Sequence, residues 1–245
     1  MKIFKEIHFK TKENKKKKIY FGMPSNPEEL KEMFRLRYEI FLQKGYISKE
    51  SFPDGLERDE YDIKGKCYYF IAKIDDQIIG TARLIRSEVL PAEKECFRFI
   101  EPKEMKEIPP EKRVEVSRVI SKGYKINDEF LPRHLILLGL LDSIFYFAQK
   151  KDFRGGYSFV RKSLKEKLKK LKIPFHQINH FTIAESHKYL EKYRGYFEDP
   201  KDPPVPIYYI RDEMKIFFEK VFNNSHIFKK IDERKFELKR NNKIL

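Results

Sequence analysis

The stretch Arg113-Val-Glu-Val-Ser-Arg-Val-Ile-Ser121 carries charged side chains inside an otherwise apolar and β-branched run. Its composition predicts a β-strand. In a regular pleat, Glu115 and Arg118 would point to opposite faces of the sheet, because successive side chains alternate. Only a β-bulge between them would bring both side chains to one site, so the presence or absence of a bulge tests whether they belong together.

Two more strands are indicated upstream, at Cys67–Ile74 and Ile78–Arg86, and the short Asp75–Gln77 link between them predicts a hairpin. Alternation places Arg83 on one face with three apolar or β-branched residues, where arginine is rare unless it is paired. The alternative is that Arg83 is a charged residue that protects an exposed edge strand from pairing.

The helices follow from capping and periodicity. An Asn-Pro-Glu-Glu start predicts a helix that runs to Phe41, and the apolar His134–Gln149 run predicts a buried helix. Gly155–Val160 and Ile173–Ile178 are typical of strands and flank a helix at Arg161–Lys172. This order predicts an α/β fold with no internal repeat, in a single domain over residues 1–245 with a core at about 20–212 and basic extensions at 1–19 and 222–245.

Composition limits the kind of protein. Apolar residues make up 40% and charged residues 37% of 245 residues, which is enough for a substantial core. Cys67 and Cys96 have no metal-ligand spacing, and the N-terminus lacks the apolar segment of a signal peptide. Leu135–Ala148 is shorter than the roughly 20 apolar residues of a membrane span. We expect a reduced cytoplasmic protein with no metal and no membrane span.

The net charge of +15 is concentrated at the ends. Residues 1–20 hold eight lysines against two acids, and residues 229–245 hold seven basic residues against three acids. Lys15–Lys18 could form a nucleic-acid-binding arm, but lysine-rich composition more often maintains solubility. A basic surface would also suit an acidic protein partner.

Arg37 lies on the same helical stripe as Phe34 and Phe41. A buried charge without a partner costs several kcal/mol, so Arg37 needs carboxylates if it is buried. Asp59 and Asp62, spaced by three in the loop Phe52–Asp62, are the nearest candidates. In the alternative, Arg37 extends to water and the two acids decorate an exposed loop.

At these residues the chain resembles the autoinducer-synthase-like branch of the GNAT acyltransferases, over residues 28–200. The resemblance rests on four segments in the same order, namely Arg35–Phe41, Phe52–Asp62, Gly80–Leu84 and Glu115–Arg118. The Phe52–Asp62 loop, Ile183–His187 and Arg194–Phe197 look most like acyltransferases associated with exosortase (PEP-CTERM) systems; N-acyl amino acid synthases are similar as well. Quorum-signal synthases of the branch usually carry Trp after the first helix, whereas this chain has Tyr46 and no Trp.

The resemblance implies a GNAT fold, with a central mixed but mostly antiparallel twisted sheet flanked by helices. It also implies transfer of a fatty acyl group from an acyl carrier protein or coenzyme A thioester to the amine of a small acceptor, often an amino acid. A carboxylate would take the amine proton, with Glu115 as first choice and Asp59 or Asp62 as alternatives. Arg37, Arg83 and Arg118 would hold an acceptor carboxylate and orient the acids.

The remaining expectations concern substrates and partners. We expect substrate contacts from Phe41, Tyr46, Ser117, Leu137, Leu141 and Phe145. Arg133 would contact the donor phosphate, and the donor is a substrate, so no bound cofactor is expected. The Lys165–Lys172 face would attract an acyl carrier protein. The alternatives are an acyl-homoserine-lactone synthase that uses S-adenosylmethionine, and a non-enzymatic basic nucleic-acid-binding module.

Overall fold

The computed structural model describes the chain except residues 12, 124, 127–128, 131–132, 185–187 and 240–245. Only the backbone is described for 125–126, 129–130, 133 and 188–189. Among the described residues, no helix has the length and apolar character needed to cross a bilayer.

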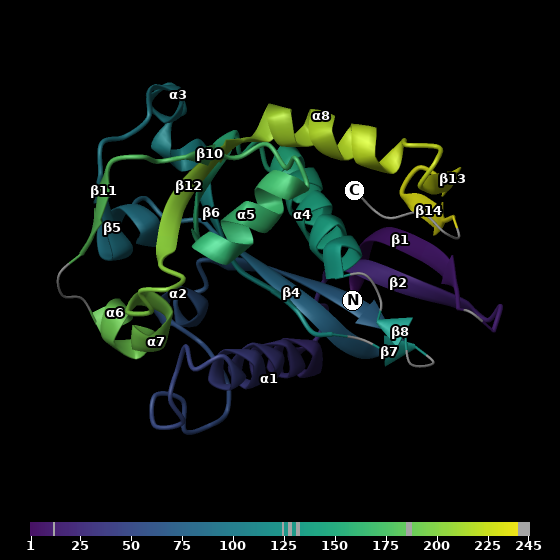
Figure 1. Ribbon diagram of the computed structural model, residues 1–245, viewed down its shortest axis with the longest axis horizontal. Coiled ribbons are helices and arrows are strands. Elements are labelled where there is room, and N and C mark those ends of the chain that lie inside the picture. The colour runs from purple at the N-terminus through teal and green to yellow at the C-terminus, as the bar shows by residue number, and fades with distance from the viewer. Residues whose placement is uncertain (12, 124, 127–128, 131–132, 185–187, 240–245) are drawn as a thin grey trace.

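A ten-stranded sheet in the order β10-β12-β9-β6-β4-β3-β2-β1-β14-β13 runs through the molecule (Figure 1). Neighbouring strands are mostly antiparallel, whereas β6–β9 and β1–β14 run parallel. The strands are β1 Lys2–Lys10, β2 Lys16–Met23, β3 Cys67–Ile74, β4 Gln77–Ile85, β6 Arg113–Ser121, β9 Gly155–Arg161, β10 His176–Gln177, β12 Pro204–Ile210, β13 Phe228–Asp232 and β14 Lys235–Leu238. Two small ribbons pair β5 Phe97–Phe99 with β11 Phe181–Ile183, and β7 Lys125–Ile126 with β8 Glu129–Phe130.

Helices cover both faces of this sheet (Figure 1). Helix α1 lies on one face, and α4, α5 and α8 lie on the other. The bounds are α1 Pro27–Gln43, α2 Glu60–Ile63, α3 Lys103–Lys106, α4 Arg133–Lys150, α5 Lys162–Lys170, α6 Lys188–Lys192, α7 Arg194–Phe197 and α8 Arg211–Phe222, with a π-helical turn η1 at Ala92–Cys96 and a 3-10 turn η2 at Pro110–Lys112. The predicted α/β fold class is confirmed.

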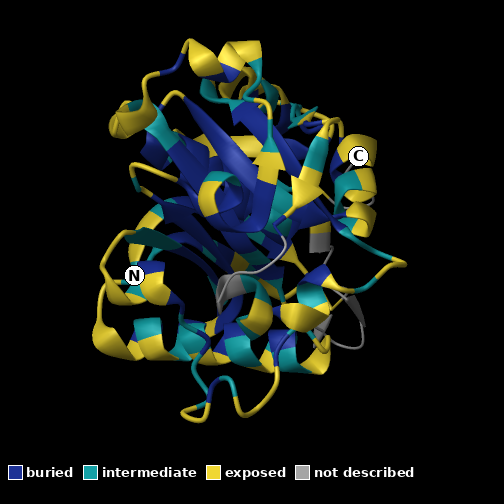
Figure 2. Ribbon diagram, turned by 90° about the vertical axis from the view of Figure 1, so that its left-hand side faces the viewer, coloured by how far each residue is buried: buried dark blue, intermediate teal, exposed yellow. Residues whose placement is uncertain are grey.

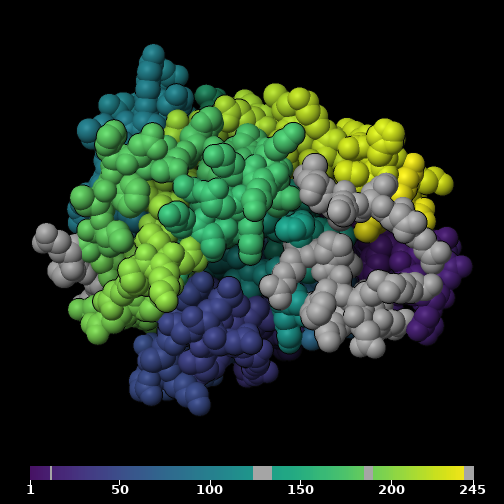
Figure 3. All heavy atoms as spheres, in the orientation of Figure 1, coloured from purple at the N-terminus to yellow at the C-terminus, as the bar shows by residue number. Residues whose placement is uncertain are grey.

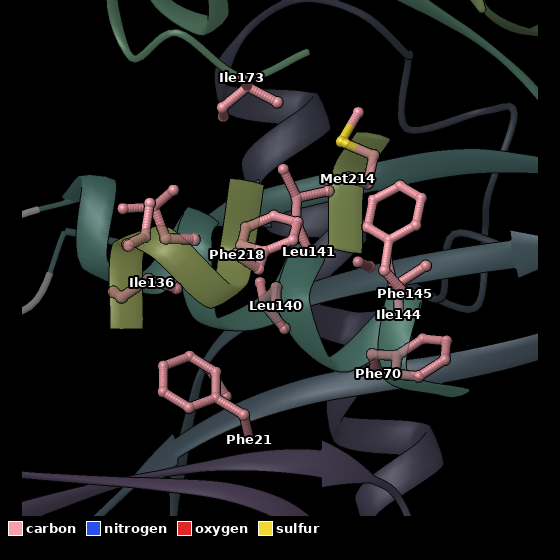
Figure 4. Packing of buried hydrophobic residues seen from close by; sticks show 14 of the residues in the cluster. Phe21, Phe70, Ile136, Leu140, Leu141, Ile144, Phe145, Ile173, Met214 and Phe218 are labelled. Carbon is pink, nitrogen blue, oxygen red and sulfur yellow. The ribbon is translucent and has the colours of Figure 1, made fainter. Parts of the chain in front are cut away.

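Helix α4 is buried because it is apolar on nearly all sides, as the sequence predicts. Figure 2 shows buried positions on the central strands of the sheet and exposed positions on the outer helices and loops. Gly139 lets α4 pack closely against β2, since a Cβ at this position would lie 2.3 Å from the Phe21 ring. Leu140, Ile144 and Phe145 of α4 join Phe70 of β3 in the main core (Figure 4).

The bulge in β6 is present. Thr81 pairs with Ile120 and Arg83 pairs with Ser117, so Arg118 and Val119 together oppose one residue of β4. Arg118 adopts a φ of 53°, the left-handed conformation found in bulges. The bulge turns Arg118 to the face that also holds Ser117, whose Oγ accepts a hydrogen bond from Arg83 Nε at 2.9 Å.

Strands β6 and β9 pair over only a short distance. Arg113–Glu115 pairs with Gly155–Tyr157, and Gly156 is required there, because a Cβ would lie 1.8 Å from the Val114 carbonyl oxygen. After Glu115 and Tyr157 the ladder ends, and the two strands diverge.

Several expectations about the elements need correction. Strand β4 lies between β3 and β6, so the edge-strand reading of Arg83 is wrong. The described residues near both ends of the chain form β1, β2, β13 and β14 of the main sheet, where the sequence indicated only basic extensions. The strand expected at Ile173–Ile178 is reduced to His176–Gln177, and the sheet position beside β9 is taken by β12.

Candidate active site

Three arginines and three carboxylates form a buried network beneath α1. The Arg37 Nε lies 2.5 Å from Glu57 Oε2, and its Nη2 lies 2.9 Å from Asp62 Oδ2. Arg83 Nη1 contacts Asp59 at 2.8 Å and Asp62 at 2.9 Å. Arg118 Nη2 contacts Glu57 at 2.9 Å and Asp59 at 3.2 Å. We call this set the arginine–carboxylate cluster: Arg37, Glu57, Asp59, Asp62, Arg83 and Arg118.

The loop before α2 folds so that its acids face the arginines. Gly55 supplies a φ of 67°, and the Glu57 amide donates to the Phe34 carbonyl of α1. The Asp59 carboxylate caps α2 by accepting hydrogen bonds from backbone amides of the helix. In return, the Asp59 amide donates to the Asp62 carboxylate, and the two interactions form a capping box. Helix capping therefore fixes both aspartates in place.

The charges of the cluster balance, and this keeps them ionised. Arg37 is fully buried, so the idea that it extends to water is wrong. Burial alone would raise the pKa of Asp62, but Arg37 and Arg83 hold it below its usual range. Burial likewise opposes ionisation of Glu57, yet Arg118 and Arg37 lower its pKa to about 2.

Glu115 is fully buried but stands apart from the cluster. Its Oε2 accepts a hydrogen bond from the Ala92 amide at 2.7 Å, and no described residue donates to Oε1. Burial raises its pKa to about 8, although the Ala92 amide and Arg83 act in the opposite direction. The pKa of Glu115 therefore lies close to neutral pH, whereas that of Asp62 lies below its usual range.

A cavity of about 340 Å³ opens where β6 and β9 diverge. On the α4 side its walls are apolar, and Figure 4 shows Leu141, Phe145 and Met214 close together with Ile173 beyond them. On the α1 side the walls are aromatic and cationic. All six residues expected to contact substrate line this cavity, namely Phe41, Tyr46, Ser117, Leu137, Leu141 and Phe145.

Of the six residues expected to be catalytic, Arg118 lines the cavity. The other five do not belong to its lining, namely Arg37, Asp59, Asp62, Arg83 and Glu115. The Arg118 guanidinium lies 5.5 Å from the Phe41 ring centroid and 4.6 Å from that of Tyr193. Cation–π contacts thus add to the ion pairs that fix Arg118. The side chain of Arg133 lies outside the described residues.

Two members of the site were missed in the sequence. Glu57 joins Arg37 to Arg118, and Tyr193 donates from its hydroxyl to Glu57 Oε1 at 2.5 Å while its ring lines the cavity. The signal for Glu57 was its place two residues before Asp59 in the same loop. No local pattern marks Tyr193, which follows α6 and reaches the site only through the tertiary fold.

Tyr46, at the position where quorum-signal synthases carry Trp, packs edge-on against Tyr196 at 5.0 Å. Arg161 lies over both rings, at 5.2 and 5.4 Å. Gly195 lets α7 touch the Gly45 backbone, because a Cβ there would lie 1.8 Å from the Gly45 oxygen. These contacts close the α1 side of the cavity. In the described part of the chain, no group of three His, Cys, Asp or Glu side chains could hold a metal ion.

Residues 32–122 match the family model of the N-acyl amino acid synthase FeeM, a segment that contains the whole arginine–carboxylate cluster and Glu115. No curated protein sequence gave a significant match.

Solved structures share the fold over most of the chain. The acyl-homoserine-lactone (AHL) synthase LasI is 14% identical, with a TM-score of 0.54 over 82% of this chain and 93% of that one. TofI, solved with an inhibitor and MTA, is 13% identical, with a TM-score of 0.58 over 82% and 96%. MesI, described as a CoA-dependent acyl-homoserine-lactone synthase, is 16% identical, with a TM-score of 0.51 over 78% and 87%.

These similarities bear out the resemblance to the autoinducer-synthase-like GNAT enzymes, and they do not concern an exosortase system. The chain shares the fold of the acyl-homoserine-lactone synthases, and residues 32–122 match the family model of the N-acyl amino acid synthase FeeM.

Proposed function

We propose that this protein transfers a fatty acyl group from a thioester donor to the amine of an amino acid. The observation that carries the proposal is the cavity at the divergence of β6 and β9, apolar at one end and aromatic and cationic at the other. An acyl chain and a small zwitterion need such opposite surroundings in one continuous space.

The apolar end suits the acyl chain. Leu137, Leu141, Phe145 and Met214 supply its walls, and each buried methylene of the chain contributes about 0.8 kcal/mol. The thioester carbonyl would lie at the bulge, where β6 has left its ladder with β9. Backbone N–H groups of β6 beyond its ladder with β9 would meet the oxyanion that forms during attack.

The aromatic end suits the acceptor. Arg118 is the cluster arginine on the cavity wall, and a guanidinium suits a carboxylate ligand. Glu57 and Asp59 hold Arg118 in place, so these acids act as positioning residues. Phe41, Tyr46 and Tyr193 would enclose the acceptor side chain.

Glu115 would accept the proton of the attacking amine. It does not belong to the cavity lining, so we place one water between the amine and the carboxylate. Its raised pKa suits a base that works near neutral pH. Asp62 is a poorer base, because two arginines stabilise its ionised form.

The donor is proposed to be an acyl carrier protein thioester, with acyl-CoA as the alternative. Helix α5 exposes lysines, and it borders the cavity through Leu164 and Lys167. The helix lies on the face of the molecule that Figure 3 shows. The basic face comprises Lys162, Lys165, Lys167, Lys169, Lys170 and Lys172. An acidic carrier would be steered to this face, so its association should weaken as salt is raised.

Charge reversal separates the two donors. Lys169→Glu with Lys170→Glu should raise the KM for the carrier-bound donor and leave the KM for acyl-CoA unchanged. The matched control is Lys229→Glu with Lys230→Glu, an exposed lysine pair on β13. Equal losses with both donors would contradict carrier docking on α5.

The main experiment incubates the purified protein with acyl-CoA and acyl carrier thioesters of several chain lengths, together with pooled amino acids. Thiol release and mass spectrometry then report the reaction and its product. We expect an N-acyl amino acid that is absent with Glu115→Ala. Thiol release that does not depend on any amine would contradict the proposal.

Homoserine-lactone synthesis is the second candidate, favoured by the fold shared with LasI and TofI. The same assay with S-adenosylmethionine in place of amino acids decides between them. If the product is an acyl-homoserine lactone, the acceptor is S-adenosylmethionine instead of an amino acid. The acyl-transfer step of the proposal would still hold.

A further inference from the structure

One oxygen of a buried carboxylate joins three separate parts of the site. Glu57 Oε1 accepts hydrogen bonds from Arg118 Nε at 3.0 Å and from Arg118 Nη2 at 2.9 Å. The Tyr193 hydroxyl donates to the same oxygen at 2.5 Å. Glu57 belongs to the loop before α2, Arg118 to the bulge in β6, and Tyr193 to the junction between α6 and α7. A residue distant in the sequence thus shares the oxygen that holds the cavity arginine.

Tyr193 also contacts Arg118 directly. The Arg118 guanidinium lies 4.6 Å from the centroid of the Tyr193 ring, so the ring and the hydroxyl restrain the same group in two ways. The ring itself is fixed, since Tyr193 is 2% exposed and its centroid lies 6.5 Å from that of Phe41 and 6.0 Å from that of Phe52. These contacts form within the chain itself, so the guanidinium is oriented before a substrate binds.

Orientation matters for Arg118 because it is the cluster arginine on the cavity wall. A guanidinium binds a carboxylate most strongly when its planar fork is aligned with the two oxygens. A long side chain that must first be ordered by the ligand binds that ligand less tightly, because the ordering costs conformational entropy. The contacts of Tyr193 therefore act on the binding of a carboxylate, before the chemical steps.

We propose that Tyr193 is a positioning residue that makes this site select acceptors with a carboxylate. Through Glu57 and through its own ring, it holds the Arg118 guanidinium in the orientation that the carboxylate of the acceptor requires. The inference rests on the proposed function, in which Arg118 binds that carboxylate. It applies to both candidate acceptors, because S-adenosylmethionine is itself an α-amino acid.

The segment that carries Tyr193 is anchored by other contacts as well. Helices α6 and α7 lie near α1 (Figure 1). Lys192 Nζ donates to the Arg58 carbonyl at 3.1 Å, and Arg161 Nη1 donates to the Tyr196 carbonyl at 2.5 Å. Tyr193→Phe removes the hydroxyl and keeps the aromatic ring, so the segment should stay in place in this variant.

The test compares two acceptors in the acyl-transfer assay. One is the amino acid identified by the main experiment, and the other is the amide of the same amino acid, which lacks the carboxylate. Tyr193→Phe should raise the KM for the amino acid on the order of tenfold, the lower end of what one hydrogen bond to a charged group contributes. It should leave the KM for the amide, the KM for the donor and kcat unchanged, whereas a general loss of folding would change all of these constants.

Inhibition constants give the same comparison without turnover. The des-amino analogue of the acceptor keeps the carboxylate, and the decarboxylated analogue keeps the amine. Tyr193→Phe should weaken inhibition by the des-amino analogue on the order of tenfold and leave inhibition by the decarboxylated analogue unchanged. Equal changes for both analogues would mean that Tyr193 only shapes the cavity, which would overturn the inference.

Two further variants separate positioning from packing and from direct contact. Tyr157→Phe removes another buried hydroxyl, which donates to Glu101 at 3.4 Å and lies outside the cavity lining, and it should keep every wild-type constant. In an Arg118→Lys background, Tyr193→Phe should have no further effect, because the group that Tyr193 positions is gone. A full effect in that background would mean that Tyr193 itself binds the acceptor, against the proposal. If Arg118→Lys does not fold, the comparison of the two analogues decides.

Failure of this inference and failure of the proposed function give different results. Wild-type acyl transfer together with an unchanged acceptor KM in Tyr193→Phe would overturn the positioning role and leave the acyltransferase in place. A wild-type protein that is inactive with every donor and acceptor would overturn the proposed function and this inference with it.

Discussion

Two buried charge networks in this protein differ in what holds them ionised. The arginine–carboxylate cluster balances three cations with three anions beside the cavity. At the far side of the sheet, Lys5 Nζ lies 3.0 Å from Asp142 Oδ2, which Arg234 contacts at 2.6 Å, so two cations share one acid. Burial, opposed by Asp142, lowers the pKa of Lys5 to about 7.

The difference shows why the site uses arginine. A buried lysine that lacks enough negative charge can lose its proton, and Lys5 is close to doing so at neutral pH. Arginine cannot be neutralised in this way, so every loss of a partner leaves a buried charge. The cluster is thus a rigid support for Arg118, whereas the Lys5 network is an adaptable link between β1, α4 and the turn before β14.

Removal of Glu57 should have the largest effect. Glu57→Gln leaves Arg37 and Arg118 short of a buried partner and should cost roughly 3–5 kcal/mol of stability together with acyl transfer. Urea unfolding measures the loss. Asp54→Asn, in the same loop but paired with Arg58 at the surface, should cost at most about 1 kcal/mol. Similar costs for the two variants would mean that the cluster is not a support.

Glu115 is a buried acid that belongs to neither network. Wild-type kcat should rise with pH toward a midpoint near 8, because the base must lose its proton. Glu115→Gln should lower kcat by about 10²–10⁴-fold and remove this rise. A rise that survives the substitution would assign the base to another group.

Asp142→Asn should be milder than Glu57→Gln, because Lys5 can give up its proton. We expect a cost of roughly 1–3 kcal/mol with transfer activity retained. Urea unfolding and the transfer assay on the same preparation check both parts. A cost as large as that of Glu57→Gln would remove the distinction between lysine and arginine.

The change in stability over a single pH unit is the smallest expected effect. Folded Glu115 keeps a proton that the unfolded chain releases. Its contribution to the free energy of unfolding is therefore fully present below about pH 4.5 and is lost as the pH rises through about 8. Lys5 acts oppositely, since above about pH 7 the unfolded chain binds the extra proton and stability rises.

Two variants test these signs by unfolding at several pH values. In a plot of unfolding free energy against pH, Glu115→Gln should flatten the part that falls with rising pH. Lys5→Met should flatten the part that rises, and each slope should change by up to about 1.4 kcal/mol per pH unit. Parallel curves for wild type and both variants would show that neither group titrates in the range.

Local patterns predicted the parts of the site that lie within single elements. Glu115 and Arg118 could lie on one face of the sheet only if β6 contained a bulge. Strand alternation placed Arg83 on an apolar face, where it needed a charged partner. Glu57 was missed because a turn-rich loop has no periodicity to reveal which acid points inward. Tyr193 depends on the packing of α6 and α7 against α1, which no local pattern encodes.

The strands near the two ends of the chain were not predicted, for a different reason. In β1 the apolar residues Ile7 and Phe9 are buried, but Lys5 and Glu6 are buried beside them, so the segment lacks the regular alternation that predicts a strand. In β12 the prolines at 204 and 206 weakened the strand signal. These segments complete the sheet through partners distant in the sequence.

The short ladder between β6 and β9 divides the sheet into a plate of three strands and a plate of seven, as far as the described residues extend. In mechanical terms it is a seam fastened at one end, with the rest of its length left open. An acyl chain in the proposed orientation would fill the open length and brace the plates against each other. The substrate would then complete the architecture, and loading the donor and stiffening the protein would be one event.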